Sequence, residues 1–318
     1  MNSTFVVGID VGGQTSKIGV VDARGTVLAQ TVIRTDTHDT VEPYIAELAA
    51  AVKRVIAEAD VEGKVRGICV GAPNGNYYTG TIENAPNLVW GRQRVEFAKL
   101  LSEAMDGLPV ALTNDANAAA VGEMTYGAAR GMKNFIMITL GTGVGSGIVI
   151  NGEVVYGHDG FAGELGHVAA VRNNGRTCGC GKTGCLETYA SATGVARTAR
   201  EWLELTDEPS ALRGLDTIAS KDVYEAAKDG DKLALKIFEF TGKILGRSFA
   251  DFIAFSSPEA IVLFGGLARA KEFLTEPIEE AMNANVLPLW RGKVKIVYSQ
   301  LKESDAAILG ASALAWEL

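Results

Sequence analysis

The amino-acid sequence predicts an α/β protein with two lobes that are built on the same plan. A chain of 318 residues suggests about two domains, and an apolar content of 47% is enough to form sizeable cores. The pattern strand, glycine-rich turn, strand, short turn, strand starts at Phe5 and returns at Phe135, an offset of about 130 residues. We therefore expect two similar lobes, each directing a glycine-rich turn toward one shared ligand.

In the first half of the chain, runs of β-branched and aromatic residues predict strands, and apolar residues at helical spacing predict helices. The expected strands cover Phe5–Ile9, Ile18–Asp22, Val27–Ile33, Val65–Gly71 and Pro109–Thr113. The expected helices cover Pro43–Ala59, Phe97–Met105 and Ala116–Tyr126. Pro43 suits the first turn of its helix, where a backbone N–H has no partner to lose.

The second half repeats the opening pattern and then becomes mostly helical from Leu186 to Phe255. Asn151-Gly152 predicts a hairpin turn between two short strands. We expect a first lobe of residues 1–117, onto which a C-terminal helix at about 303–318 packs, and a second lobe of residues 118–302. The expected strands cover Phe135–Leu140, Ile148–Ile150, Glu153–Tyr156, Ala260–Phe264 and Val294–Tyr298.

Glycine-rich turns that directly follow strands are candidate phosphate-binding loops, because they let backbone N–H groups approach phosphate oxygens without a Cβ in the way. None has the spacing of a P-loop or of a dinucleotide fingerprint. Two of them occupy the same place in the repeated unit, which predicts a nucleotide held between the lobes, and a third could lie against a flat adenine ring. The candidate contacts are Asp10, Gly12, Gly13, Gln14, Thr15 and Lys17 in the first turn, Gly141, Thr142 and Gly143 in the second, and Gly265 and Gly266 in the third.

Two aspartates after strands are candidates for chemistry. Asp10 suits hydrated Mg2+, which prefers one carboxylate together with waters and phosphate oxygens; an aspartate that stabilises the turn is the alternative. Asp115 lies where a strand gives way to a helix, the fixed and accessible corner that a general base needs. A helix N-cap is the commoner role for such a residue, and the local sequence does not decide between the two.

Three of the four cysteines lie within eight positions, at Cys178, Cys180 and Cys185, and His167 precedes them by eleven residues. Three thiolates and an imidazole are the ligand set of a closed tetrahedral zinc site. A disulfide with a spare thiol and three buried apolar residues are the alternatives, but an intracellular cysteine cluster more often binds metal. Four protein ligands leave no position for water, so we expect a structural zinc. Cys69 is expected to fill the core.

Glu164 and His167 lie three residues apart and face the same way on one helical turn. A zinc-bound imidazole keeps a second ring nitrogen for another hydrogen bond. Together with Glu187, these groups are suited to bind several hydroxyls of a sugar, because carboxylates accept hydrogen bonds from hydroxyls. The metal would then act on the substrate only by holding the loop rigid.

Charge and the N-terminal residues exclude several classes of protein. The net charge of −8 argues against non-specific affinity for nucleic acid or for an anionic membrane. The N-terminus has no basic region followed by a long apolar stretch, so no signal peptide is expected. The weakly charged run Phe135–Ile150 is too short to span a bilayer. These features predict a soluble, cytosolic protein.

Taken together, these motifs resemble the ROK family of bacterial sugar kinases and sugar-responsive repressors. The likeness runs from the first strand to the last fifth of the chain, and the Glu-x-Gly-His and cysteine motifs are specific to the family. The matching stretches are Asp10-x-Gly-Gly-x-x-x-Lys17, Asn114-Asp115-Ala-Asn-Ala-Ala, Leu140-Gly-Thr-Gly-Val-Gly-x-Gly147, Glu164-x-Gly-His167, Cys178-Gly-Cys-Gly-x-x-Gly-Cys185-x-Glu187 and Gly265-Gly266.

The resemblance implies the duplicated, ribonuclease H-like fold of the actin-like ATPases, with nucleotide and sugar in a cleft between the lobes. It implies a cytoplasmic, homodimeric kinase that uses ATP and Mg2+ and carries Zn2+. The expected reaction converts D-glucose to glucose 6-phosphate, with Asp115 as the general base. The implied sugar contacts are Asn87, Asn114, Asp115, Glu164, His167 and Glu187, and the implied zinc ligands are His167, Cys178, Cys180 and Cys185.

Two stretches depart from the family pattern. In the first loop, Gln14 and Thr15 stand where the family usually reads Gly-Gly-Thr-Lys, and this departure affects the expected phosphate contacts. The second stretch, Gly71–Gly80, is longer than the usual Gly-x-Pro-Gly turn near the sugar, and this departure affects the expected identity of the sugar. Fructose, mannose and N-acetylhexosamines are the alternative substrates. A sugar-sensing regulator is less favoured, since the first strand begins at residue 5 and leaves no room for a helix-turn-helix segment. An actin-like ATPase without a small substrate would leave the Asp115 and zinc motifs without a purpose.

Overall fold

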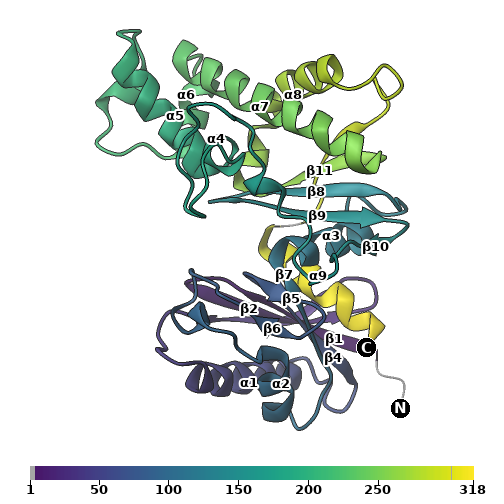
Figure 1. Ribbon diagram of the computed structural model, residues 1–318. Helices are drawn as coiled ribbons and strands as arrows, with labels where there is room; N and C mark the ends of the chain where they lie inside the picture. The colour runs from purple at the N-terminus through teal and green to yellow at the C-terminus, as the bar shows by residue number, and fades with distance from the viewer. Residues whose placement is uncertain (1–3, 302) are drawn as a thin grey trace. The chain divides into compact units, whose positions relative to one another are not determined.

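The computed structural model describes residues 4–301 and 303–318 and divides into two compact units (Figure 1). Unit 1 comprises Met1–Met132, Gly147–Gly163 and Gln300–Leu318, and unit 2 comprises Lys133–Ser146 and Glu164–Ser299. This division differs from the predicted lobes of residues 1–117 and 118–302. The predicted boundary falls inside helix α3 (Asp115–Tyr126), which packs with elements of unit 1.

The sheet of unit 1 has the strand order β3-β2-β1-β4-β7. Strands β1 to β3 are antiparallel neighbours, whereas β4 runs parallel to β1 and β7 runs parallel to β4. The carboxyl ends of the parallel strands β1, β4 and β7 therefore meet at one edge of the sheet. The strands are β1 (Phe5–Val11), β2 (Thr15–Asp22), β3 (Val27–Arg34), β4 (Val65–Ala72) and β7 (Val110–Asn114).

Helices cover both faces of this sheet (Figure 1). Because side chains alternate between the faces of a strand, Val7 and Ile9 of β1 enter one core cluster and Val6 enters another. The first cluster contains apolar residues of α1 and α2, and the second contains those of α3 and α9. The helices are α1 (Val41–Glu58), α2 (Phe97–Ala104), α3 and the C-terminal α9 (Glu303–Leu314).

Glycines allow α3 and α9 to approach each other closely. A Cβ added at Gly122 of α3 would lie only 2.6 Å from the Cα of Gly310 in α9. Likewise, a Cβ at Gly8 of β1 would lie 2.2 Å from the carbonyl oxygen of Ile308. Real Cβ atoms do not reach such distances from backbone, so these positions admit no larger residue without a shift of the helices.

We expect Gly122→Ala to lower the free energy of unfolding by about 1–3 kcal/mol, because the added methyl group forces α3 and α9 apart. Urea unfolding of the purified chain measures this effect. Gly214→Ala is the matched control, since a Cβ there meets no heavy atom within 4 Å among the described residues. Equal stability of the two variants would contradict the close packing of these helices.

The second sheet has the order β10-β9-β8-β11-β12, which repeats the plan of the first sheet: a hairpin extended by a third strand on one side and parallel strands on the other. The predicted duplication is therefore confirmed. The strands are β8 (Phe135–Leu140), β9 (Val144–Ile150), β10 (Glu153–Val154), β11 (Ala260–Phe264) and β12 (Lys295–Tyr298).

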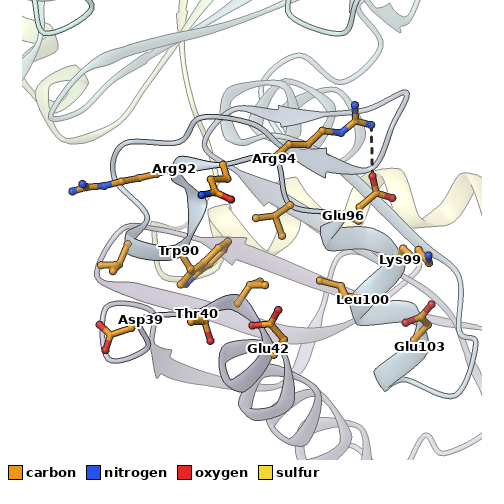
Figure 2. Close-up of a pocket in the computed structure, with 14 residues that line it drawn as sticks. Asp39, Thr40, Glu42, Trp90, Arg92, Arg94, Glu96, Lys99, Leu100 and Glu103 are labelled. Carbon is orange, nitrogen blue, oxygen red and sulfur yellow. Dashed lines mark ion pairs between the residues drawn. The ribbon is translucent and has the colours of Figure 1, made fainter.

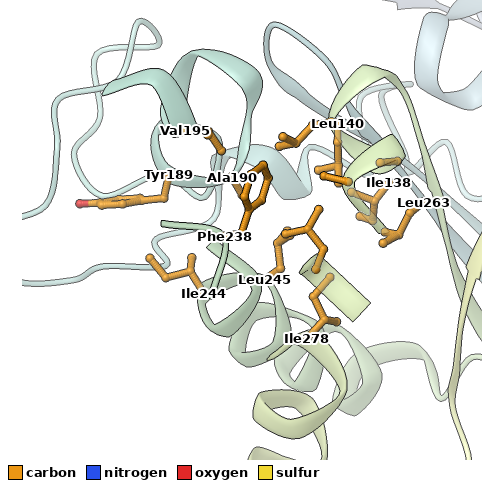
Figure 3. Close-up of a cluster of buried hydrophobic side chains, with 14 of the residues drawn as sticks. Ile138, Leu140, Tyr189, Ala190, Val195, Phe238, Ile244, Leu245, Leu263 and Ile278 are labelled. Atoms are coloured by element: carbon orange, nitrogen blue, oxygen red, sulfur yellow. The ribbon is translucent and has the colours of Figure 1, made fainter. Parts of the chain in front are cut away.

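Long helices pack on the second sheet and bury the core of unit 2. Ile138, Leu140 and Leu263 of the sheet lie against Phe238 and Leu245 of α7 (Figure 3). The helices of this unit are α4 (Glu187–Ala190), α5 (Ala192–Leu205), α6 (Ser220–Lys228), α7 (Lys232–Ser256) and α8 (Lys271–Asn285). None of the helices formed by residues 4–301 and 303–318 combines the length and apolar content needed to cross a bilayer.

Some boundaries differ from the predicted ones. Strand β9 begins at Val144 instead of Ile148, so the second glycine turn is shorter than the glycine run suggests. Gly147 lies inside β9, where a Cβ would come within 2.9 Å of the Cβ of Ala120. The short elements that the sequence did not predict are β5 (Gly75–Asn76), β6 (Thr81–Ile82) and the 3-10 helices η1 (Val89–Arg92), η2 (Leu165–His167), η3 (Ala211–Gly214), η4 (Gly266–Ala270) and η5 (Ala315–Glu317).

Candidate active site

In unit 1, the carboxyl ends of β1, β4 and β7 bring the two candidate aspartates to one edge of the sheet. Asp10 pairs with Gly71 of β4, and Gly71 pairs with Thr113 of β7. Neighbouring strands lie about 4.8 Å apart, so the backbones at Asp10 and Thr113 are about 10 Å apart. Asp115 starts α3 directly after β7. Both carboxylates therefore lie at the same edge of the sheet.

Asn114, and not Asp115, is the N-cap of α3. The side-chain Oδ1 of Asn114 accepts hydrogen bonds from the backbone N–H groups of Ala116 at 2.7 Å and Asn117 at 3.2 Å. Asp115 is the first helical residue, and its Oδ1 accepts from the Ala116 N–H at 2.8 Å. Since the cap is already supplied, the exposed Asp115 carboxyl group is available for another role.

Both carboxyl groups bind protons more tightly than usual. Although water reaches the exposed residue Asp115, surrounding protein atoms partly desolvate its carboxyl group and raise its pKa. Desolvation, and then the negative charge of Asp115, raise the pKa of Asp10 to about 6, although the Lys17 ammonium group acts in the opposite direction. A divalent cation at Asp10 would relieve this unfavourable charge.

We expect Asp10→Asn to stabilise the metal-free protein above pH 6. A folded-state pKa of about 6 against 3.8 corresponds to at most about 3 kcal/mol. Because the folded pKa is raised, the wild type keeps its full stability below about pH 4 and loses this amount as pH rises through 6. Urea unfolding at pH 7.5 should therefore favour the variant, and the difference should shrink at pH 4.5. The control is Asp106→Asn, at a side chain that is 84% exposed; a less stable Asp10→Asn at pH 7.5 would contradict the charge argument.

The first glycine turn contacts Asn87, a candidate sugar ligand. A Cβ at Gly13 would lie 2.8 Å from the carbonyl oxygen of Asn87, and the residue Asn87 is exposed. The N–H of Gly12 donates to the Thr15 carbonyl at 3.0 Å, which closes the turn. The side chain of Gln14 is exposed, whereas its carbonyl oxygen accepts from the Thr35 N–H at 2.9 Å.

The unusually full loop Gly71–Gly80 is firmly held in unit 1. Asn74 adopts a left-handed conformation with φ 52°, and its Nδ2 donates to the carbonyl of Glu83 at 3.0 Å. Asn76 Nδ2 donates to the carbonyl of Asp159 at 2.8 Å. In addition, the rings of Tyr77 and Tyr156 stack with their centres 4.1 Å apart. These contacts, which sequence patterns could not predict, fix a loop that ends close in sequence to Asn87.

In unit 2, the other two glycine turns follow neighbouring parallel strands. Phe264 of β11 pairs with Thr139 of β8, so Gly265 and Gly141 leave the sheet side by side. Gly265 has φ 102°, and a Cβ there would lie 2.6 Å from the Leu140 carbonyl oxygen. The carboxyl ends of parallel strands are where α/β proteins bind nucleotides. The structure therefore brings together the candidate residues of both turns.

Glu187 of α4 lies against the turn at Gly143. Its Oε2 accepts from the Val144 N–H at 3.0 Å, and a Cβ at Gly143 would come within 2.3 Å of that oxygen. On the other side of the turn, Thr193 Oγ1 donates to the Thr142 carbonyl at 2.6 Å. The glycine at 143 thus lets the Glu187 carboxylate lie directly against the turn, a contact that the sequence did not reveal.

Glu164 precedes η2 as its N-cap and His167 ends η2, beside the same turn. The Leu165 N–H donates to Ser146 Oγ at 3.0 Å, and a Cβ at Gly166 would lie 2.0 Å from the Val144 carbonyl oxygen. Glu164 is exposed, and its carbonyl accepts from the His167 N–H at 3.1 Å. The predicted single turn that carries both side chains is therefore present.

His167, Cys178, Cys180 and Cys185 form a cluster whose candidate ligand atoms all lie within 4.8 Å of one another. His167 Nδ1 is 3.7 Å from Cys178 Sγ, and Cys180 Sγ is 3.7 Å from Cys185 Sγ. Zinc bonds of about 2.3 Å in a tetrahedron place sulfurs about 3.8 Å apart, so the spacing fits this metal. Burial and the neighbouring thiols raise the pKa of Cys185 to about 12, and only a bound cation would keep it as a thiolate near neutral pH.

Arg176, which the sequence analysis did not single out, fixes the cysteine loop to α4 and α5. Its side chain is 8% exposed, and the guanidinium group lies 4.5 Å from the centre of the Tyr189 ring. It donates to the Thr188 carbonyl at 2.8 Å, to Thr198 Oγ1 at 2.9 Å and, through Nε, to Glu201 at 3.0 Å. A lone arginine between small residues carries no sequence signal of this role.

A separate pocket of about 670 Å³ lies in unit 1, between the start of α1 and the segment that leads into α2 (Figure 2). Trp90 lines it together with side chains of both charges, among them Arg92, Glu42 and the ion pair of Arg94 and Glu96 at 3.7 Å. Since the charges are mixed, the pocket indicates no single ligand charge. None of the predicted site residues lines it.

Comparison with known proteins gives consistent results. The sequence profile of the ROK family matches residues 6–317. A glucokinase of Halalkalibacterium halodurans is 38% identical over 317 residues, which cover 98% of this chain and 94% of that protein. A xylose repressor of Caldicellulosiruptor bescii is 27% identical, over 97% of this chain and 77% of the repressor. The crystal structure of a ROK family glucokinase from Streptomyces griseus in complex with glucose and AMPPNP superposes with a TM-score of 0.81 at 33% identity, covering 99% of this chain and all of that one.

Proposed function

Because the chain belongs to the ROK family, we propose that it is an ATP-dependent hexose kinase that converts glucose to glucose 6-phosphate. The glucokinase of Halalkalibacterium halodurans matches nearly the whole chain, and the similar Streptomyces griseus structure contains glucose and an ATP analogue. The duplicated α/β fold is the one that the sequence predicted.

Asp115 is the proposed general base. It takes the proton from the 6-hydroxyl of the sugar, and the oxygen then attacks the γ-phosphate in line. The observation that supports this role is that Asn114 caps α3. The exposed carboxyl group of Asp115 is therefore not needed as the cap. Most of the rate would come from positioning and from neutralising the phosphate charge.

ATP is proposed to bind at the three glycine turns, and Asp10 to hold Mg2+. When bound, Mg2+ neutralises phosphate charge. Asp10, Gly12, Gly13, Gln14, Thr15 and Lys17 follow β1 in unit 1, whereas Gly141, Thr142, Gly143, Gly265 and Gly266 follow β8 and β11 in unit 2. The raised pKa of Asp10 supports this assignment, because a cation would offset the charge that burial disfavours.

The proposed hexose contacts are Asn87, Asn114, Asp115, Glu164, His167 and Glu187. Zn2+ is proposed to bind His167, Cys178, Cys180 and Cys185. Since His167 Nδ1 faces Cys178 at 3.7 Å, Nε2 is left for a sugar hydroxyl. Glu187 Oε2 already accepts from the Val144 N–H, and Oε1 lies 3.7 Å from Cys178 Sγ. A zinc-bound thiolate at Cys178 would have no proton to donate, so Oε1 is the better candidate for the sugar. We also propose that the chain acts in the cytoplasm.

A coupled assay of ADP release with a panel of hexoses tests the function. We expect glucose to give the highest kcat/KM, with fructose, mannose and N-acetylglucosamine lower. Formation of glucose 6-phosphate is measured separately with its dehydrogenase. If another hexose is phosphorylated and glucose is not, that hexose is the substrate in place of glucose. If no hexose is phosphorylated, the proposed kinase activity is wrong.

A further inference from the structure

Three buried hydroxyl groups form a hydrogen-bonded network at the end of the first glycine turn in unit 1. The Oγ of Ser16 lies 2.7 Å from Thr35 Oγ1 and 2.6 Å from the hydroxyl oxygen of Tyr44. The three residues are at most 1% exposed, and they come from β2, from the position after β3 and from α1. The network therefore joins three elements, across as many as 28 residues of sequence.

Ser16 occupies a position in β2 where the strand pattern favours an apolar side chain. Side chains two residues apart share a face of a strand, and Ile18 and Val20 belong to the first core cluster of unit 1. Val11 of β1, which pairs with Ser16, belongs to the same cluster. Burying a hydroxyl group there costs free energy unless it finds a hydrogen-bond partner. Apolar groups of the same shape in place of both partners can be equally stable, so the stability of the core does not by itself require the network.

The network continues into the backbone of the first glycine turn. The N–H of Thr35 donates to the Gln14 carbonyl at 2.9 Å, and the N–H of Gly12 donates to the Thr15 carbonyl at 3.0 Å. Thr35 thus binds Gln14 through its backbone and Ser16 through its hydroxyl group. Glycine loses more conformational freedom than any other residue when it is fixed. A turn with two glycines therefore depends on such bonds to keep one shape.

Tyr44 attaches the network to α1. Its ring stacks on Trp90, with the ring centres 4.8 Å apart, and lies 6.2 Å from the ring of Phe97. Burial raises the pKa of Tyr44 above its ordinary value, and the negative charge of Asp10 acts in the same direction, whereas the hydrogen bond with Ser16 opposes them. The phenol therefore stays protonated at neutral pH, on a ring whose position is fixed by packing.

We propose that Tyr44, acting through Ser16 and Thr35, is a positioning residue for the first glycine turn and so for the phosphates of ATP. The role rests on the proposed binding of ATP at this turn. Because the hydroxyl groups are buried, they do not touch the nucleotide. They keep the backbone N–H groups of the turn in the arrangement that binds phosphate oxygens. A misplacement of about 1 Å far from the reacting atoms can cost about 100-fold in rate.

Tyr44→Phe tests this role, because it removes the hydroxyl group and leaves the ring beside Trp90. The affinity for ATP, measured by calorimetry without sugar, should fall about fivefold or more, the ratio that corresponds to one lost hydrogen bond. The KM for ATP should rise with it, and the KM for glucose should change by less than about twofold. A variant that is only less stable would not separate the two KM values in this way.

Tyr126→Phe is the matched control in the same unit. The Tyr126 hydroxyl accepts from Trp316 Nε1 at 2.6 Å, and both rings pack against the other core cluster, which contains residues of α3 and α9. This variant loses a hydrogen bond of the same kind without touching the turn. It should therefore bind ATP as the wild type does. Equal affinities for ATP in Tyr44→Phe and the wild type would overturn the inference.

Further variants test whether the three hydroxyl groups act as one unit. Ser16→Ala should weaken ATP binding as Tyr44→Phe does, and the double variant should be no worse than the weaker single one, since both changes break the same network. Thr35→Ser keeps the hydroxyl group and should bind ATP normally, whereas Thr35→Val should not. Additive losses in the double variant would contradict a shared network. A wild type that binds ATP but phosphorylates no hexose would contradict the proposed function, while the ATP affinities of the variants would still decide the role of Tyr44.

Discussion

Asp115→Asn is expected to lower kcat by about 10²- to 10⁴-fold. The amide keeps the size of the carboxyl group but cannot take the proton from the sugar hydroxyl. The helix should not suffer, because Asn114 provides the cap of α3. Glucose binding, measured by calorimetry without ATP, should therefore change little, and the loss should lie in kcat.

The pH dependence of kcat adds a second measurement. A general base works only when deprotonated, so kcat of the wild type should fall as pH falls through the pKa of Asp115, which desolvation raises above its ordinary value. The residual activity of Asp115→Asn should lack this acid limb. Asp106→Asn, the same change at a side chain that is 84% exposed, should match the wild type. A kcat for Asp115→Asn within threefold of the wild type would exclude Asp115 as the base.

Cys180→Ser is expected to release the metal and to lower the free energy of unfolding by about 4 kcal/mol or more, because metal binding in a structural site is folding energy. Cys180 is exposed, so a serine there creates no cavity and the loss reports the metal. Elemental analysis should find about one zinc per chain in the wild type and much less in the variant. Thermal unfolding with and without a chelator measures the stability.

The chelator supplies the control for this substitution. It should lower the Tm of the wild type toward that of Cys180→Ser and should leave the variant nearly unchanged. Cys69→Ala, in the core of unit 1 and outside the cluster, should lose stability through its cavity and still bind zinc. Wild-type protein purified without chelators and found free of zinc would contradict the proposed metal site.

Most strands and helices could be predicted because their signals are local. Phe135–Leu140 and Ala260–Phe264 were predicted with the bounds that the structure has, since short runs of buried β-branched and aromatic residues between turns leave few alternatives. The bounds of β9 were missed: Gly145 and Gly147 suggest a turn by residue type, yet both lie in the strand. At Gly147 the reason is tertiary, since a Cβ would meet Ala120.

Sequence patterns named the residues of the candidate site, but not the contacts that position them. Asp115 and Asn114 were both named, but residue type alone favoured Asp115 as the cap, and the hydrogen bonds give the cap to Asn114. Glu187 was named for its place after the cysteines, whereas its bond to the Val144 N–H depends on how α4 meets a turn 43 residues away. Arg176 was missed, because its partners Thr188, Thr198 and Glu201 come together only in the folded unit.

By itself the sequence determined the duplicated plan, the glycine turns after strands, the grouping of three cysteines with a histidine and the family, because each depends on residue type at fixed spacing. Only the tertiary structure decided that Asn114 and not Asp115 caps α3, that the Glu187 carboxylate lies against the turn at Gly143 and how the cysteine loop is anchored. These properties depend on distances between segments far apart in the chain, and such distances follow from the packing of sheets and helices, which no local pattern encodes.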